Sequence, residues 1–160
     1  MSLNFYLPVH GTAIYKTDNY TFRSGLGATA VSNWEITGKN SESLPAIRQK
    51  ISEFKRLRPY FYGDYYPLTP VRTGDREWLA YQLNRPAAHD GIILAFRRND
   101  SGEESIHVRL GGLDENADYE LLFEDYNLRI VKSGRELSEG LELAIPLKPA
   151  SLLVSYRKNQ

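Results

Sequence analysis

The chain has no cysteine and no excess of charge of either sign. Without cysteine, its 160 residues contain neither a disulfide framework nor a thiolate nucleophile. Its 20 basic residues balance 20 acidic ones, so no net field attracts nucleic acid or an anionic membrane. No apolar run approaches the roughly 18 residues of a membrane span, and Met1 is not followed by a signal peptide. We therefore expect a soluble globular protein without a nucleic-acid or membrane partner, and the sequence indicates no compartment.

The usual motifs of metal, phosphate and serine-hydrolase chemistry are also missing. His10, His89 and His107 are far apart and have no cysteine beside them, so we predict no transition-metal site. The segment from Gly25 to Gly27 lacks the following glycine and the Lys-Ser or Lys-Thr pair of phosphate-binding loops. No Gly-x-Ser-x-Gly elbow occurs. These absences predict no bound cofactor.

Arg97, Arg98 and Arg109 are the candidates for a basic patch. Acidic residues within positions 100–104 offset their charge, which favours a solvated strand edge over an anion site. His107 alternates with apolar neighbours and is therefore expected on the solvated face of its strand.

Apolar residues alternate with polar ones through most of the second half of the chain. This period of two is typical of strands with one solvated face. The run from Ile92 to Phe96 is apolar on both faces and predicts a more central strand. The expected strands cover residues 79–84, 92–96, 106–110, 119–124, 141–145 and 152–156. Turn residues separate these six or seven short strands, and no helical pattern lies between them. We therefore predict an antiparallel β-sandwich.

The first half has a different pattern. Ile47, Ile51 and Phe54 recur at helical spacing, which predicts an amphipathic helix over residues 45–58. Residues 29–36 have the composition of a strand that precedes it. A single β/α unit cannot bury both faces of its strand, so we expect this part to belong to a larger structure.

Five aromatic rings lie within seven residues after the expected helix. Pro59 ends that helix, and Pro67 and Pro70 exclude a regular central strand. We therefore predict a connection that buries these rings between two structural units. The five rings are Tyr60, Phe61, Tyr62, Tyr65 and Tyr66. The expected parts are residues 1–59, a junction over residues 60–77, and a sandwich domain over residues 78–160.

Several segments together resemble the carboxyl-terminal part of the alpha-galactosidase (melibiase) group, family 36 of the glycoside hydrolases. The similar segments are residues 20–27, residues 33–35, the helix, residues 63–69, residues 94–98, residues 110–114 and residues 133–137. Their order and spacing carry the resemblance, which runs from about Leu7 to Arg157. In that family a catalytic barrel precedes an antiparallel β-sandwich. The resemblance thus implies a mainly β chain that holds the last β/α unit of a TIM-type barrel followed by the sandwich.

The resemblance implies no catalytic residue in this chain. The catalytic pair of that family consists of aspartates on earlier barrel strands, and a complete barrel takes about 250 residues. Asp18, Glu35 and Asp64 match no catalytic motif, so we expect loop carboxylates or turn caps at these positions. Trp34 is the one candidate for substrate binding, because it lies near the carboxyl end of the expected last barrel strand. A ring in the barrel core or at a domain interface is the alternative interpretation.

Two functions remain open at this stage. The first is a non-catalytic, carboxyl-terminal fragment of an alpha-galactosidase-like hydrolase, inactive alone, whose sandwich supports the barrel and whose substrate is an alpha-galactoside or related oligosaccharide. The residues around position 66 depart from the Gly-x-x-Tyr-Arg-Leu pattern of better-known members, so galactose is implied by kinship alone. The second is a free-standing carbohydrate- or protein-binding β-sandwich module. We also expect residues 6–34 to pack on the sandwich or on a second copy of the chain, which would give a homodimer.

Overall fold

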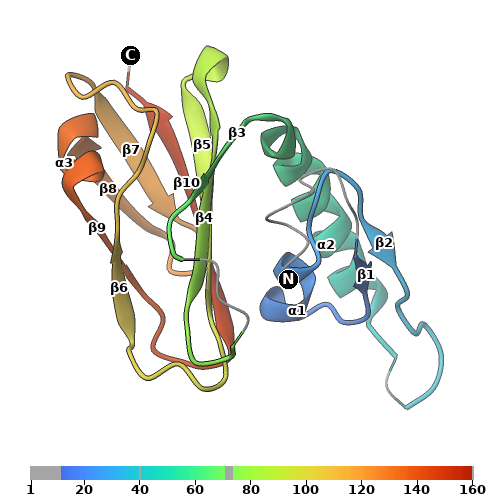
Figure 1. Ribbon diagram of the computed structural model, residues 1–160. Helices are drawn as coiled ribbons and strands as arrows, with labels where there is room; N and C mark the ends of the chain where they lie inside the picture. The colour runs from blue at the N-terminus through green and yellow to red at the C-terminus, as the bar shows by residue number, and fades with distance from the viewer. Residues whose placement is uncertain (1–11, 40, 71–73, 160) are drawn as a thin grey trace. The chain divides into compact units, whose positions relative to one another are not determined.

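The computed structural model describes residues 12–39, 41–70 and 74–159. The chain divides into two compact units between Tyr62 and Gly63, and Figure 1 labels the helices and strands of both. No helix in the described ranges is long and apolar enough to cross a membrane.

The first unit has the order strand, helix, strand, helix. β1 (Ala13–Ile14) and β2 (Val31–Ser32) form a parallel pair, and α1 (Asn19–Ser24) connects them (Figure 1). The strand expected over residues 29–36 is therefore wrong in length. Within the described residues β2 pairs with β1 alone. The pairing is short because β1 itself contains only two residues.

The predicted helix is confirmed as α2 (Leu44–Leu57). The Ser43 side chain caps it by accepting a hydrogen bond from the Ala46 amide, and Pro45 occupies the first turn. The buried stripe differs from the predicted one. Lys50 is buried on this helix, whereas Ile51 is 39% exposed.

A buried ionic cluster of Arg23, Lys50 and Glu53 joins α1 to α2. Arg23 Nε lies 2.8 Å from one carboxylate oxygen of Glu53, and Lys50 Nζ lies 2.8 Å from the other. Lys50 also donates a hydrogen bond to the Asn19 side chain and sits 5.0 Å from the centroid of the Phe22 ring. Lys50 can be buried because its ammonium group contacts a carboxylate, an amide oxygen and the face of an aromatic ring.

The second unit is antiparallel throughout its two sheets. The larger sheet has the strand order β3-β4-β5-β10-β7-β8, and β6 pairs with β9 in a separate sheet (Figure 1). The strands are β3 (Asp64–Pro67), β4 (Leu79–Arg85), β5 (Asp90–Arg97), β6 (Ser105–Val108), β7 (Asp118–Phe123), β8 (Leu128–Ser133), β9 (Leu141–Ala144) and β10 (Ala150–Lys158). The predicted mainly β, antiparallel fold is confirmed.

The core of the second unit lies between these two sheets. Apolar side chains of β6 and β9, such as Val108 and Leu143, belong to one buried cluster with Ile93 of β5 and Val154 of β10. All of β5 is buried, and it lies between β4 and β10. This confirms the prediction that the run within residues 92–96 forms a central strand.

Three elements of this unit were not predicted. β3 ends at Pro67, which an edge strand tolerates because that side of the sheet needs no further donor. β8 is the opposite edge. The helix α3 (Gly134–Glu139) begins with a capping box, in which the Ser133 hydroxyl accepts from the Glu136 amide and the Glu136 carboxylate accepts from the Ser133 amide. The Ser-x-x-Glu pattern was a sequence signal for this helix.

The prediction that the five clustered rings are mostly buried is wrong. Phe61 alone is fully buried, and Tyr62 is 64% exposed at the end of the short helix η2 (Arg58–Tyr62). The remaining three are half-buried. Tyr65 and Tyr66 lie on an edge strand, where successive side chains point to opposite faces, so one environment cannot enclose both.

The neighbouring rings of Phe61 and Tyr62 differ in burial and give a stability prediction. Phe61→Ala should lower the free energy of unfolding by about 3–5 kcal/mol, the usual cost of deleting an enclosed ring. Tyr62→Ala is the matched control and should change it by less than about 0.5 kcal/mol, because its ring is already in water. Urea unfolding followed by circular dichroism measures both. Equal losses for the two variants would contradict the assigned burial.

Arg97 and Arg98 do not form a solvated strand edge, so that expectation is wrong. Both side chains are buried. Arg97 donates to the carbonyl oxygens of Ile145 and Pro146 at 2.9 Å and 2.7 Å, and Arg98 donates to the carbonyl of Gly74. The guanidinium groups satisfy loop carbonyls at the end of β5, a role that residue spacing alone does not reveal. The expected exposure of His107 is confirmed.

Candidate pocket at the carboxyl ends of β1 and β2

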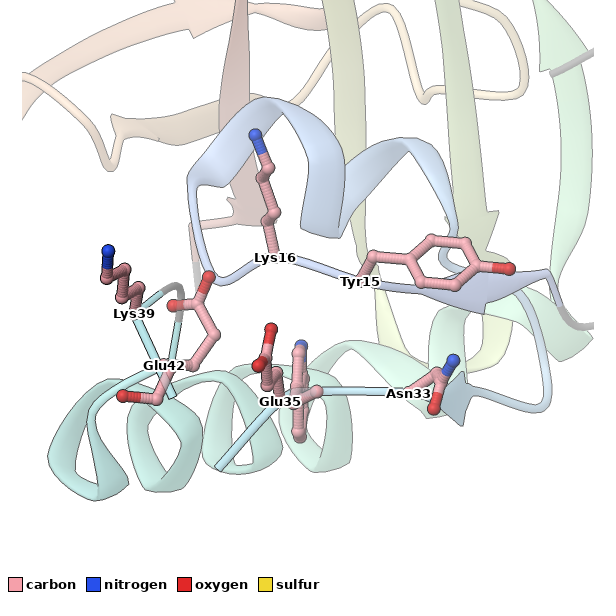
Figure 2. Close-up of a pocket in the computed structure, with 8 residues that line it drawn as sticks. Tyr15, Lys16, Asn33, Glu35, Lys39 and Glu42 are labelled. Atoms are coloured by element: carbon pink, nitrogen blue, oxygen red, sulfur yellow. The ribbon is translucent and has the colours of Figure 1, made fainter. Parts of the chain in front are cut away.

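A pocket of about 840 Å³ lies in the first unit, where the parallel strands β1 and β2 end (Figure 2). Two chain segments form it: the residues that follow β1 and the loop that follows β2. Its walls are Tyr15, Lys16, Asn33, Trp34, Glu35, Lys39, Ser41 and Glu42. The volume lies within the range of about 300–1,000 Å³ that is usual for small-molecule sites.

Backbone hydrogen bonds set the shape of the pocket. The Asn33 amide donates to the Ile14 carbonyl at 2.9 Å, which continues the β1–β2 pairing beyond the strands. The Glu42 amide donates to the Glu35 carbonyl at 2.7 Å and closes the loop between them. Gly38 turns this loop with a φ of 109°, a conformation that favours glycine. The loop is therefore a closed structure attached to the end of the sheet.

A side-chain contact ties the two segments together. The Thr17 hydroxyl, which follows β1, donates a hydrogen bond to the Glu42 carboxylate at the end of the loop after β2. Glu42 is half-buried, whereas Glu35 is exposed. The Glu42 carboxylate thus connects the two segments that form the pocket, and the Glu35 side chain is exposed to water.

The aromatic side chains of the pocket differ in exposure. Tyr15 is 58% exposed. Trp34 is half-buried, and among the described residues its indole nitrogen is buried without a hydrogen-bond partner. A buried unpaired N–H costs about 1–3 kcal/mol, so the indole has a donor available for an acceptor from outside the described residues.

The structure separates the carboxylates that the sequence analysis considered. Asp18 is the N-cap of α1 and accepts a hydrogen bond from the Thr21 amide at 2.9 Å, as expected for a cap. Asp64 is exposed at the start of β3, in the other unit. Glu35 lines the pocket beside Trp34. Of the residues named from the sequence, the neighbours Trp34 and Glu35 therefore both line the pocket, and Asp18 and Asp64 do not.

Sequence reasoning missed Tyr15, Lys16 and Glu42. Tyr15 and Lys16 follow a strand of two residues, which is too short to show a periodic pattern. Their nearness to Trp34 depends on the parallel pairing of β1 with β2. Within the described ranges, no group of three or more His, Asp or Glu side chains is arranged to hold a metal ion.

This chain is similar in structure to parts of solved alpha-galactosidases. For a variant of the GH36 alpha-galactosidase AgaA from Geobacillus stearothermophilus in complex with raffinose, the TM-score is 0.65 at 19% identity, over 87% of this chain. For AgaB from the same organism the values are 0.60, 21% and 88%. For the galactosidase domain of the alpha-galactosidase-sucrose kinase AgaSK they are 0.64, 17% and 93%. This chain shares the fold of one part of these enzymes.

The extent of the match limits what it shows. The chain covers 19%, 19% and 22% of the lengths of these three proteins, so most of each enzyme has no counterpart in it. No family model matches the sequence, and no curated protein sequence is significantly similar to it. The likeness predicted from the order of short segments is thus found in the fold.

Proposed function

We propose that this chain is the carboxyl-terminal, non-catalytic part of an alpha-galactosidase-like glycoside hydrolase that acts on alpha-linked sugars. The observation that carries this proposal is that the fold likeness runs through 87–93% of this chain yet spans about a fifth of enzymes that are much longer. Both coverage values are explained most simply if this chain corresponds to one part of a longer hydrolase.

The first unit supplies the last strands and the last helix of a catalytic barrel. Parallel strands are normally buried on both faces and paired on both edges. Here Val31 of β2 is 54% exposed, and Ile36 in the following loop is 61% exposed. In this proposal the rest of the barrel packs against these apolar side chains and buries them. The exposure of Val31 also supports the homodimer predicted through residues 6–34, of which residues 6–11 lie outside the described residues.

In this proposal the second unit supports the barrel. The described residues of the first unit's pocket supply no pair of catalytic carboxyl groups. Retaining glycosidases use two carboxyl groups about 5 Å apart. In the pocket of this chain, Glu42 is already bound by Thr17, and Glu35 is left without an organised carboxyl partner among the described residues. The nucleophile and the proton donor therefore belong to barrel strands outside this sequence.

The proposed substrate is an alpha-galactoside of an oligosaccharide. Solved neighbours have been captured with raffinose and with stachyose, both of which contain an alpha-linked galactose. Trp34 faces the sugar in this proposal, because it follows β2 at the end where barrel active sites are built. The alternative position in the barrel core predicts lost stability and unchanged substrate affinity for Trp34→Phe.

The test compares the isolated chain with the polypeptide that carries it in its natural source. The isolated chain should release no nitrophenol from p-nitrophenyl alpha-galactoside, because the described residues of its pocket offer no organised pair of catalytic carboxyl groups. A polypeptide captured from the source by an antibody against this chain should be several times larger than 18.3 kDa and should hydrolyse the same substrate. Mass spectrometry of the captured band gives its size.

The controls separate the two candidate functions. An aryl beta-galactoside is the control substrate and should remain intact with the captured polypeptide. A captured species of 18.3 kDa without hydrolase activity would favour the free-standing binding module instead. Turnover by the isolated chain that disappears in Glu35→Gln would overturn the non-catalytic assignment.

A further inference from the structure

We infer that the exposed side of α2 is a docking surface for the acidic second unit of another copy of this chain. The inference goes beyond the proposed hydrolase function and does not depend on it, because it concerns the association of this chain with itself. It also involves other residues than the homodimer predicted through residues 6–34. The docking surface is the basic face of α2, which consists of Leu44, Arg48, Ile51 and Lys55.

The four residues of the basic face lie along one side of the helix. They are spaced by four, three and four positions, which places them above one another on a helix of about 3.6 residues per turn. All four are exposed, and the two apolar ones keep 53% and 39% of their surface in water. The helix buries a different side, which carries Ile47, Lys50 and Leu57. The basic face is therefore left at the surface.

The basic face carries positive charge that the chain does not neutralise locally. Neither Arg48 nor Lys55 has an ion-pair partner among the described residues. The one acidic residue of α2, Glu53, is already bound by Arg23 and Lys50. Basic and apolar side chains alternate along this face, so it suits a partner surface that is both acidic and partly apolar.

The second unit has the charge that such a partner needs. Residues 1–62 contain 8 basic and 4 acidic residues, a net charge of +4, whereas residues 63–160 contain 12 basic and 16 acidic ones, a net charge of −4. The balanced charge of the whole chain thus conceals two units of opposite sign. Two copies can attract each other through unlike units. Nucleic acid or an anionic membrane would repel the second unit, so these charges favour a second copy.

One surface of the second unit combines exposed acidic and apolar side chains. The Tyr126 hydroxyl donates to the Ala144 carbonyl at 3.0 Å, which holds the turn between β7 and β8 beside the end of β9. Tyr126 is 49% exposed, and Leu147, which follows β9, is 77% exposed. Glu142 is exposed on the same side of β9 as Ala144. The acidic patch formed in this way consists of Asp125, Tyr126, Glu142 and Leu147.

The acidic patch matches the basic face in composition. The patch has two acidic and two apolar residues, and the face has two basic and two apolar ones. Each copy carries one of each surface, so a dimer with two-fold symmetry contains the same contact twice and leaves neither surface uncovered. We therefore expect the chain to form a dimer in which α2 of each copy contacts the acidic patch of the other.

Sedimentation equilibrium of the whole chain tests this inference. At about 0.01 M salt and about 100 µM protein, we expect a species of twice the chain mass of 18.3 kDa. At about 1 M salt the dissociation constant should be at least about tenfold higher, because the Debye length falls from about 30 Å to about 3 Å.

Exchanging the charges of the two surfaces identifies the contact. Arg48→Glu and Glu142→Lys should each raise the dissociation constant of the dimer about tenfold. An equimolar mixture of these two variants should associate as well as the wild type, because both contacts of the mixed dimer again join unlike charges. Lys39→Glu makes the same charge change at an exposed position of the first unit outside the basic face and should have no effect.

Several results would overturn the inference. They are a chain that stays monomeric in low salt, a mixture that associates no better than the single variants, and an effect of Lys39→Glu equal to that of Arg48→Glu. A dimer lost in Val31→Ser but kept in Arg48→Glu would place the contact at residues 6–34 instead. Binding to vesicles of phosphatidylcholine and phosphatidylserine by a monomer, abolished in Arg48→Glu, would make the face a lipid-binding surface. None of these results affects the proposed function, which depends on the activity of the captured polypeptide.

Discussion

Replacing Glu53 with glutamine should lower the free energy of unfolding by about 3–5 kcal/mol, because it removes the carboxylate charge that two buried cations contact. Arg23 and Lys50 each have about 5% of their side chain exposed, and both are bound by this one carboxylate. Glutamine keeps the shape and one acceptor oxygen but removes the charge. Because the three side chains join α1 to α2, the loss should appear in global unfolding by urea.

An exposed ion pair provides the matched control for this variant. Arg129 Nη1 and the Glu120 carboxylate form a pair on β7 and β8 whose side chains are 59% and 47% exposed. Exposed pairs contribute about 0–1 kcal/mol, so Glu120→Gln should have a small effect. Similar losses for Glu53→Gln and Glu120→Gln would show that the cluster around Glu53 is not buried in solution.

The same carboxylate predicts a pH dependence of stability. Burial alone would raise the pKa of Glu53, but Arg23 and Lys50 together hold this pKa below its ordinary value. The stabilisation is therefore fully present above the unfolded pKa of about 4.3 and is lost as the pH falls through the lower, folded value. The stability difference between the wild type and Glu53→Gln should shrink as the pH falls below about 4. A difference that stays constant over this range would contradict the assignment.

Replacing Gly91 with alanine should lower the free energy of unfolding by about 3–5 kcal/mol, through overpacking and lost hydrogen bonds. A Cβ at this position of β5 would lie 2.1 Å from the Tyr156 hydroxyl and 2.7 Å from the Leu83 carbonyl oxygen. The tyrosine cannot move freely, because its hydroxyl accepts from Gln82 at 2.7 Å and donates to Asn84 at 2.8 Å. The methyl group must therefore break this buried network or displace a neighbouring strand.

Gly140→Ala is the matched control for Gly91→Ala. A Cβ at Gly140 meets no atom within 4 Å, and its φ of 170° is extended backbone that alanine adopts. Calorimetry of both variants should show a large fall in melting temperature for Gly91→Ala and a small change for Gly140→Ala. A stable Gly91→Ala protein whose Tyr156 network is intact would show that β4, β5 and β10 adjust more readily than these distances imply.

Much of the second unit could be predicted because its signals are local. The alternation of apolar and polar residues determines which face of a strand is buried, so strands such as β4, β7 and β10 were found from the sequence. The uniformly apolar run in β5 likewise indicated a central position. Edge strands carry a weaker signal, since they need not bury a complete face. β3 and β8 were missed for that reason.

The candidate pocket could be predicted only in part. Trp34 was singled out by its position near the carboxyl end of the expected strand, and its place in the pocket agrees with that reasoning without testing the role of its ring. Tyr15 carries no sequence signal of its own. It joins Trp34 because β1 and β2 pair in parallel, which brings their carboxyl ends to the same edge.

The sequence by itself determined the type and order of most elements, the antiparallel sandwich and the resemblance to one end of a larger hydrolase. Periodicity, turn residues and caps act over a few neighbouring positions, so they can be read without knowing the fold. Only the tertiary structure decided that Arg97 is buried, that Tyr62 is exposed and that Lys50 belongs to a buried ionic cluster. The physical reason is that burial of a long or charged side chain depends on the carbonyl, carboxylate or ring that meets its polar end, and such partners come from residues distant in the sequence.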